Sequence, residues 1–350
     1  MNSNTSVSTE TPKRSGSTVG EYIVRILNGM AQGLFASLII GLIIKQIGNY
    51  AEIGMLSRFG QAAQYLMGPA IGVGVAVAVK APPLGIFCAA VTGALGAGTF
   101  GWEGAVAVKI MIGEPVGALL AGLAGAEASK LVAGKTKVDI ILVPLTAILV
   151  GGLVGVSLAP VVAVMMKAIG AFINSLTTLY PLPMGILVSV VVGMVLTLPI
   201  SSAAICISLG ISGLAAGAAT VGCCAQMVGF AVSSYRENKL GGLISQGLGT
   251  SMLQMPNIVR NWKVWIPPTL TAAILGPLAT LVFKMENNAA GAGMGTSGLV
   301  GQFNTIATMG PESWWKILLL HIVLPAALTL VFSEYMRRKG WIKAGDLKLV

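Results

Sequence analysis

Four ionisable side chains interrupt an otherwise apolar stretch of the chain. Glu103, Lys109, Glu114 and Glu127 stand among glycine, alanine, valine, isoleucine and leucine residues. Ionisable groups are costly at membrane depth, so they are candidates for function wherever such a segment spans a bilayer. Carboxylate oxygens accept hydrogen bonds from hydroxyl groups. The pattern therefore suits the binding of a polyhydroxylated substrate.

Glu103 directly follows Trp102. A carboxylate beside an aromatic ring can hold a sugar by hydrogen bonds to its hydroxyls and by stacking on the ring. The alternative is that Trp102 anchors the membrane interface and that Glu103 is a solvated neighbour. We keep both interpretations.

Glu114 lies between Gly113 and Pro115, at a break where a carboxylate could face a cavity. The alternative is an intramembrane ion pair with Lys109. Glu127 and Lys130 are three residues apart near a predicted cytoplasmic helix end, and this spacing favours a simple helix pair over a ligand site.

The second half of the chain carries uncharged polar groups where the first half carries carboxylates. Ser201 and Ser202 follow Pro199, and Gln226 and Asn257 come later in the same half. A site between the halves would then suit a neutral polyol better than an ion, although each amide could instead form a hydrogen bond between helices. The candidate substrate-binding residues are Glu103, Glu114, Ser201, Ser202, Gln226 and Asn257, and no catalytic residue is assigned.

Other motifs exclude several kinds of site. The cysteines (Cys88, Cys206, Cys223 and Cys224) have no CxxC spacing, so we interpret them as packing residues and expect no metal and no cofactor. His321, the single histidine, is expected to be a packed, hydrogen-bonded group, with a proton relay as the less favoured alternative. No complete phosphate-binding loop occurs.

The composition is that of an integral membrane protein. Of the 350 residues, 55% are hydrophobic and only 10% are charged, with a mean hydropathy of +0.85, whereas soluble domains average about 25% charged residues. The sequence predicts an all-α polytopic membrane protein with about ten transmembrane or re-entrant segments. They are expected near residues 24–46, 62–81, 83–100, 104–131, 139–167, 183–198, 200–222, 224–248, 264–283 and 314–334.

An internal repeat predicts two related halves. Met67-Gly68 and Met184-Gly185 each begin an apolar run that ends at a proline, Pro82 or Pro199, with an offset of 184 − 67 = 117 in both cases. Duplicated apolar halves are typical of membrane transporters. We place the halves near residues 60–167 and 177–285, within a membrane domain of residues 21–335.

The distribution of basic residues predicts the orientation. With ten spans, 16 of the 22 lysines and arginines fall on the side of the N-terminus, which favours both termini in the cytoplasm of a bacterial cell (inner) membrane. The net charge of +10 is explained by loops beside anionic lipid, without nucleic acid. Residues 1–20 are expected to form a disordered cytoplasmic tail and residues 336–350 a basic cytoplasmic tail.

Several motifs together resemble the compact IIC membrane subunits of the bacterial phosphoenolpyruvate-dependent sugar phosphotransferase system. They are Pro82-Pro83-Leu84, residues 249–257, Ile266-Pro267-Pro268, Gly276-Pro277 and the glycine-rich residues 291–302. The resemblance covers about residues 20–335 and is greatest to the branch with perfringolysin-regulator-like proteins. It implies a sugar permease, a homodimer in membrane lipid, that presents its substrate to separate phosphorylated IIB and IIA proteins. The alternatives are an uncoupled secondary transporter and a membrane sensor or regulator.

Overall fold

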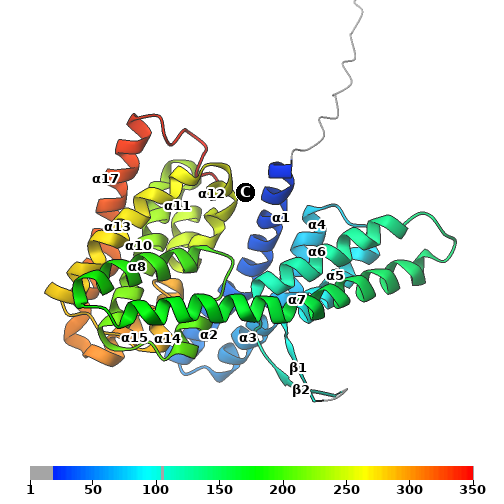
Figure 1. Cartoon of the computed structure of the whole chain (residues 1–350), viewed down its shortest axis with the longest axis horizontal. Helices are drawn as coiled ribbons and strands as arrows, with labels where there is room; N and C mark the ends of the chain where they lie inside the picture. Colours follow the sequence, from blue (N-terminus) through cyan, green and yellow to red (C-terminus); the bar gives the residue numbers. More distant parts are fainter. Residues whose placement is uncertain (1–18, 104–105, 350) are drawn as a thin grey trace, which may run out of the picture.

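The computed structural model of the chain describes residues 19–103 and 106–349. Almost the whole of the expected N-terminal tail therefore lies outside the described residues. Figure 1 shows two groups of helices joined by one long helix, α7 (Asp139–Thr177). We call residues 19–132 the N-terminal bundle and residues 181–349 the C-terminal bundle.

The N-terminal bundle contains six α-helices, a π-helix and a β-hairpin. In chain order they are α1 (Val19–Leu34), η1 (Phe35–Ile39), α2 (Ile40–Tyr50), α3 (Gly54–Tyr65), α4 (Met67–Ala78), α5 (Pro83–Ala97), β1 (Phe100–Glu103), β2 (Val106–Ile110) and α6 (Pro115–Val132).

The C-terminal bundle alternates long helices with short and irregular ones. Its first elements are α8 (Pro181–Thr197), α9 (Ser202–Leu209), α10 (Gly213–Ser233), α11 (Tyr235–Ile244), η2 (Ser245–Gly249), η3 (Ser251–Gln254), α12 (Met255–Arg260), η4 (Trp262–Trp265), α13 (Ile266–Pro277) and η5 (Leu278–Val282). Its later elements are α14 (Ala289–Ala292), η6 (Ser297–Leu299), α15 (Val300–Met309), η7 (Pro311–Ser313), α16 (Trp314–Ile317), η8 (Leu318–Val323) and α17 (Leu324–Arg338).

The prediction of an all-α polytopic membrane protein is confirmed. The described residues include six helical runs that are long and apolar enough to cross a bilayer: Val19–Asn49, Pro115–Val132, Asp139–Thr177, Gly213–Ser233, Trp262–Val282 and Pro311–Arg338. Three shorter apolar helices, α4, α5 and α8, accompany them. A helix needs about 17–25 apolar residues to span the hydrocarbon core, so α4 (12 residues) and α5 (15 residues) are too short, and α8 (17 residues) is at the lower limit.

Two predicted segments differ from the structure. The segment expected at 104–131 begins as a helix only at Pro115, because residues 100–103 and 106–110 form the antiparallel strands β1 and β2. The break expected between 222 and 224 is wrong, because α10 continues through it from Gly213 to Ser233. Gly222 lets α10 pack closely against α8, because a Cβ atom at this position would lie 1.9 Å from the Ser189 carbonyl oxygen.

Both repeat prolines lie between two helices. Pro82 precedes α5 and follows α4, while Pro199 lies between α8 and α9. The helices that follow differ, since α5 has 15 residues and α9 only 8. The duplication therefore stays a prediction.

The two bundles meet at two π-helices. A Cβ atom on Gly249, the last residue of η2, would lie 2.8 Å from Phe35 Cε2 of η1. Met252 of η3 joins the hydrophobic core of the N-terminal bundle, beside Phe35 and Leu38. π-Helices are rare and frequently mark functional sites, and here one from each bundle lies at the contact.

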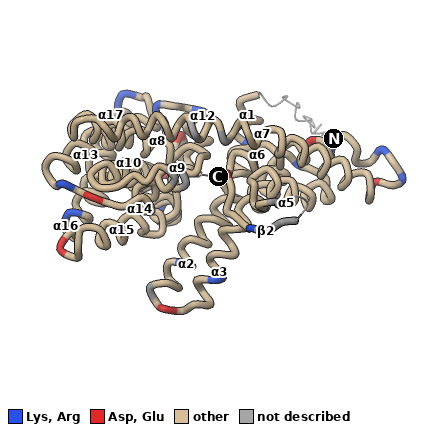
Figure 2. Tube along the Cα trace, turned by 60° about the horizontal axis from the view of Figure 1, so that its bottom comes forward, with Lys and Arg blue, Asp and Glu red and all other residues tan. Residues whose placement is uncertain are grey.

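Residues 336–349 were expected to form part of a basic tail, but in the structure this segment packs onto the C-terminal bundle. Ile342 and Leu347 are buried in a core cluster with Phe230 and Val264. Figure 2 shows lysine, arginine, aspartate and glutamate mainly at helix ends and loops, as expected for a chain whose helices cross a bilayer.

Candidate functional site

Glu114 is positioned by the break that precedes α6. Gly113 has a φ of +80°, a conformation that glycine adopts at little cost, and Pro115 occupies the first helical turn. The Glu114 N–H donates to the Ala97 carbonyl at 2.9 Å. The break therefore holds the carboxylate against the end of α5.

The structure brings Glu114 and Ser201 together across the two bundles. The backbone N–H of Ser201 donates a hydrogen bond to the Glu114 carboxylate. The second oxygen, Oε2, is buried and has no hydrogen-bond partner among the described residues. A buried polar atom without a partner is costly, so this oxygen is suited to accept a hydrogen bond from a ligand.

Thr99 adds a second uncommitted polar group near the same break. Its Oγ1 is buried without a partner among the described residues, and it lies two residues after Ala97, the acceptor of the Glu114 N–H. A threonine hydroxyl both donates and accepts. The segment after α5 thus carries a further hydroxyl group that can donate or accept a hydrogen bond.

The alternative partner of Glu114 is absent. The Lys109 side chain is exposed on β2, and no ion pair between it and Glu114 occurs in the described part of the chain. Glu127 and Lys130 do form the expected helix pair at 2.6 Å, supported by a hydrogen bond from the Tyr22 hydroxyl to Glu127. Glu103 ends β1, but its side chain lies outside the described residues.

Ser202 joins α9 to the glycine-rich segment. Its hydroxyl is buried and donates to the Gly293 carbonyl at 2.7 Å. Ser202 is the neighbour of Ser201 in the sequence. Its side chain, however, is bonded within the C-terminal bundle and not to Glu114.

Gln226 is the centre of a buried polar network. Its Oε1 accepts from Trp265 Nε1 at 3.0 Å, and its Nε2 donates to Thr269 at 3.1 Å. Thr197 links Gln226 to Ser251, with a distance of 2.8 Å between the two hydroxyl oxygens. Because Thr197 ends α8 four residues before Ser201, this network lies on the chain segment that reaches Glu114.

Asn257 is committed elsewhere. Its Nδ2 donates to Gln254 Oε1 at 2.7 Å and to the Lys348 carbonyl at 3.0 Å. Gln254 in turn donates to Gln246 and to the Leu347 carbonyl. These amides hold the C-terminal segment, and no contact of Asn257 with Glu114 or Ser201 is seen in the described structure.

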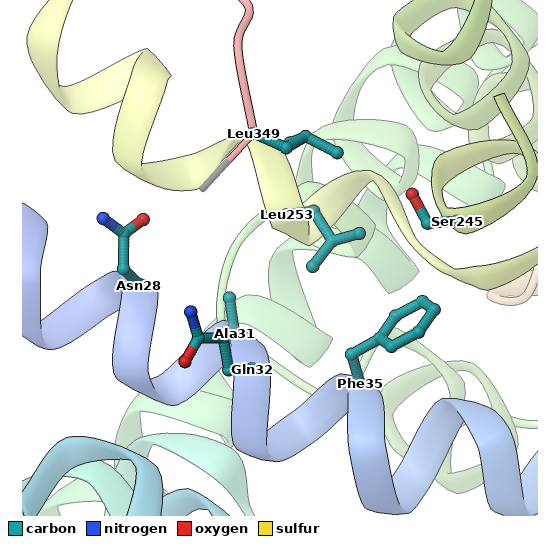
Figure 3. A pocket seen from close by; sticks show the side chains of 7 residues that line it. All are labelled: Asn28, Ala31, Gln32, Phe35, Ser245, Leu253 and Leu349. Atoms are coloured by element: carbon teal, nitrogen blue, oxygen red, sulfur yellow. The ribbon is translucent and has the colours of Figure 1, made fainter. Parts of the chain in front are cut away.

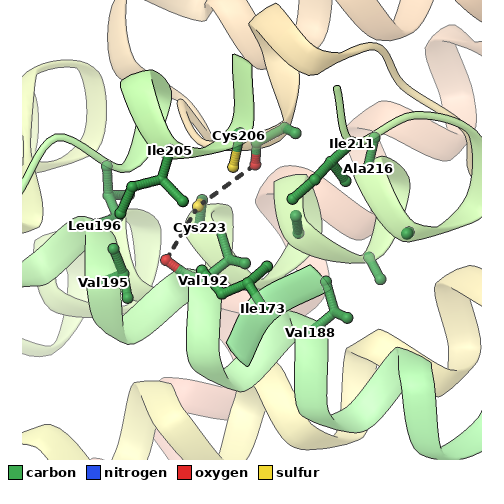
Figure 4. Packing of buried hydrophobic residues seen from close by; sticks show 14 of the residues in the cluster. Ile173, Val188, Val192, Val195, Leu196, Ile205, Cys206, Ile211, Ala216 and Cys223 are labelled. Carbon is green, nitrogen blue, oxygen red and sulfur yellow. Dashed lines mark hydrogen bonds between the residues drawn. The ribbon is translucent and has the colours of Figure 1, made fainter. Parts of the chain in front are cut away.

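The cysteines and the histidine lie in packed interiors. All four cysteines are free and buried, and Figure 4 shows Cys223 among aliphatic side chains. Its thiol lies 3.8 Å from the carbonyls of Val192 and Ala292. His321 is fully buried, with its Nδ1 3.1 Å from Gln302 Nε2. Within the described residues, no cluster of histidine, cysteine, aspartate and glutamate could hold a metal ion.

The fold and this site define a class of protein. It is a polytopic helical membrane protein that has an uncharged polar network and a half-buried carboxylate between two bundles. The family described as phosphotransferase system, EIIC matches residues 24–349, so the chain belongs to this family. No curated protein and no solved structure matched the chain. The protein is therefore a sugar permease subunit of a phosphotransferase system, with a sugar as substrate and IIA and IIB proteins as partners.

Proposed function

We propose that the permease holds its sugar at the Glu114 break, between the N-terminal and C-terminal bundles. The single observation that supports this most is the half-buried Glu114 carboxylate, which accepts a hydrogen bond from the Ser201 N–H and has one buried oxygen, Oε2, without a partner among the described residues. Thr99 supplies a further hydroxyl at the same break. The carboxylate accepts hydrogen bonds from two sugar hydroxyls and so orients the ring.

In this proposal, the other predicted residues support the site in different ways. Gln226 stiffens the segment between α8 and Ser201 through Thr197, and Ser202 fixes α9 through Gly293. Asn257 anchors the C-terminal segment. Glu103 remains a candidate that sits at the hairpin preceding Glu114.

The mechanism is alternating access between the two bundles. The carboxylate and its Ser201 partner belong to different bundles, so relative movement of the bundles opens and closes the sugar site. A phosphorylated IIB protein then transfers its phosphoryl group to a sugar hydroxyl at the inner face. Both termini lie in the cytoplasm in this arrangement.

The resemblance also favours a homodimer surrounded by lipid. Only 28% of an 18-residue apolar window of α7 is buried within one chain, and Val156, Val161 and Val164 of this helix are exposed. This apolar surface suits lipid tails or the α7 helix of a second copy. Native mass spectrometry in a mild detergent would show a two-chain species if the dimer forms.

A binding experiment tests the site. Purified protein in proteoliposomes is titrated with glucose, mannitol, N-acetylglucosamine and lactose, with intrinsic tryptophan fluorescence as the readout. We expect Glu114→Gln to weaken binding of the recognised sugar by about tenfold or more, since hydrogen bonds to charged groups contribute about 1.5–3 kcal/mol. Glu127→Gln, which removes a carboxylate that is paired with Lys130, is the matched control and should bind normally. Equal binding by both variants would contradict the proposed site.

A further inference from the structure

A cavity of 260 Å³ lies where α1 and η1 face the C-terminal bundle. Figure 3 shows its lining side chains: Asn28, Ala31, Gln32, Phe35, Ser245, Leu253 and Leu349. Pockets for drug-sized ligands measure about 300–1,000 Å³. This cavity is smaller, and its size suits a molecule such as a monosaccharide.

One wall of the cavity is a single face of the first helical run. Asn28, Gln32 and Phe35 are four and then three residues apart, the spacing that places side chains on one side of a helix. Within the part of the chain that the structure describes, neither amide has a hydrogen-bond partner. Each amide presents a donor and an acceptor, so both can bind a ligand.

The opposite wall comes from the C-terminal bundle. Ser245 begins η2, and its hydroxyl donates to the Gly242 carbonyl at 3.4 Å, which leaves its oxygen able to accept. Leu253 lies in η3, two residues after Ser251, which contacts Thr197. The short helix η3 therefore connects this cavity with the Gln226 network and the segment that reaches Glu114.

The chemistry of the lining selects an uncharged polyol. Among the described residues that line the cavity there is no lysine, arginine, aspartate or glutamate, so these side chains offer an ion no counter-charge for its lost hydration. Two amides and a serine satisfy hydroxyl groups, while the Phe35 ring and two leucines cover the apolar faces of a sugar ring.

We propose that this cavity is a second sugar subsite, separate from the Glu114 break, in which the sugar is held at the α1 end of the path between the bundles. The proposal rests on sugar transport as the proposed function, but it does not depend on Glu114. Asn28 and Gln32 recognise hydroxyl groups, and Phe35 covers one face of the ring.

Thiol protection tests the subsite directly. The native cysteines are all buried, so Gln32→Cys introduces a single accessible thiol in the cavity of the full-length protein. The variant in proteoliposomes is labelled with a maleimide, with and without glucose, mannitol, N-acetylglucosamine or lactose. The matched control is Gln46→Cys, a glutamine of the same helical run that lines a different cavity.

We expect the sugar that the wild-type protein takes up to slow labelling of Gln32→Cys by about tenfold, and to leave the rate at Gln46→Cys unchanged. Ser245→Cys, on the opposite wall, should be protected in the same way and serves if Gln32→Cys does not fold. The subsite would be overturned if the sugar slowed labelling equally at Gln32→Cys and Gln46→Cys. It would also be overturned if the sugar slowed labelling at neither Gln32→Cys nor Ser245→Cys.

The failure of the subsite and the failure of the proposed function give different results. Normal sugar uptake by the wild-type protein without protection at Gln32→Cys or Ser245→Cys contradicts only the subsite. Protection that persists in a Glu114→Gln background supports the subsite and shows that it binds sugar independently of the Glu114 break. Absence of accumulated phosphorylated sugar when phosphoenolpyruvate, the general carrier proteins and a matching IIA and IIB pair are all present contradicts the proposed function itself.

Discussion

Two glutamates illustrate how the surroundings of a carboxylate separate a structural role from a binding role. Glu237 lies 2.8 Å and 3.1 Å from Arg337 Nη2 through its two oxygens, and its side chain is 9% exposed. Arg337 also donates to the Ser233 carbonyl. Every oxygen of Glu237 is thus used within the fold, whereas Glu114 keeps one buried oxygen uncommitted.

The Arg337–Glu237 pair should be important for stability. Arg337→Ala leaves the Glu237 carboxylate buried without its counter-charge, and breaking such a pair costs about 3–5 kcal/mol. Thermal unfolding in detergent should show a large loss. Arg236→Ala, which removes the exposed pair with Glu334, is the control and should unfold close to the wild-type temperature. A similar loss in both variants would contradict the distinction between buried and exposed pairs.

His321 and Gln302 form a buried pair, and each side chain also has one polar atom without a hydrogen-bond partner among the described residues. His321 Nε2 and Gln302 Oε1 are both unsatisfied within the described residues. If the pair has only a packing role, His321→Leu should destabilise the protein, because it removes the nitrogen partner of Gln302 Nε2 and leaves only the weak acceptor Cys224 Sγ. The double variant His321→Leu/Gln302→Leu should then lose less stability than the sum of the two single variants. Additive losses together with abolished sugar uptake would instead indicate a functional histidine.

At the scale of elements, close helix contacts depend on glycine. A Cβ atom on Gly222 of α10 would meet the Ser189 carbonyl of α8, so Gly222→Ala should destabilise the C-terminal bundle by about 1–3 kcal/mol. Gly241 of α11 has no atom within 4 Å of such a Cβ atom. Gly241→Ala should be neutral or slightly stabilising. Unfolding temperatures of the two variants check this, and an equal effect would show that α8 and α10 are not in close contact.

The sequence predicted the helical elements better than their boundaries. Long apolar runs located α1 with α2, α7, α13 and α17, because periodicity and length suffice there. The β1–β2 hairpin was missed because Val106, Ala107 and Val108 read equally well as part of an apolar helix. The break within α10 was wrong because glycines signal both breaks and close packing.

The proximity of two candidate residues could be anticipated from the sequence, while their role in binding stays a prediction. The Gly113-Glu114-Pro115 break and the serines after Pro199 were recognisable from residue type, and the structure joins Glu114 with Ser201. Asn257 was not distinguishable from a sugar ligand, because its partner, the Lys348 carbonyl, is 91 residues away in sequence. The four-residue spacing of Asn28 and Gln32 indicates that both amides lie on one face of a helix. The opposite wall of the cavity could not be predicted, because its residues are distant in the sequence and meet α1 only in the folded chain.

At the scale of the whole molecule, the two ends of the described chain lie at the same end of the molecule. Figure 1 places the C-terminal end beside α1, and Leu349 lines a cavity together with Asn28 and Gln32 of that helix. With the excess of basic residues on that side, we expect both termini in the cytoplasm. A reporter active only outside the cytoplasm, fused to Val350, should be inactive. A reporter active only inside should be active there, and the reverse result would contradict this orientation.

The central claim is that this permease moves a sugar past Glu114 for phosphorylation by a separate IIB protein. The most direct measurement is accumulation of phosphorylated sugar in membrane vesicles that contain the protein, with phosphoenolpyruvate, the general carrier proteins and a matching IIA and IIB pair. We predict accumulation only when all of these are present, and a strong reduction in Glu114→Gln vesicles that contain equal amounts of folded protein, since the variant removes the charge but preserves the shape. Sugar uptake that continues unchanged without phosphoenolpyruvate, or a Glu114→Gln variant with wild-type accumulation, would contradict the claim.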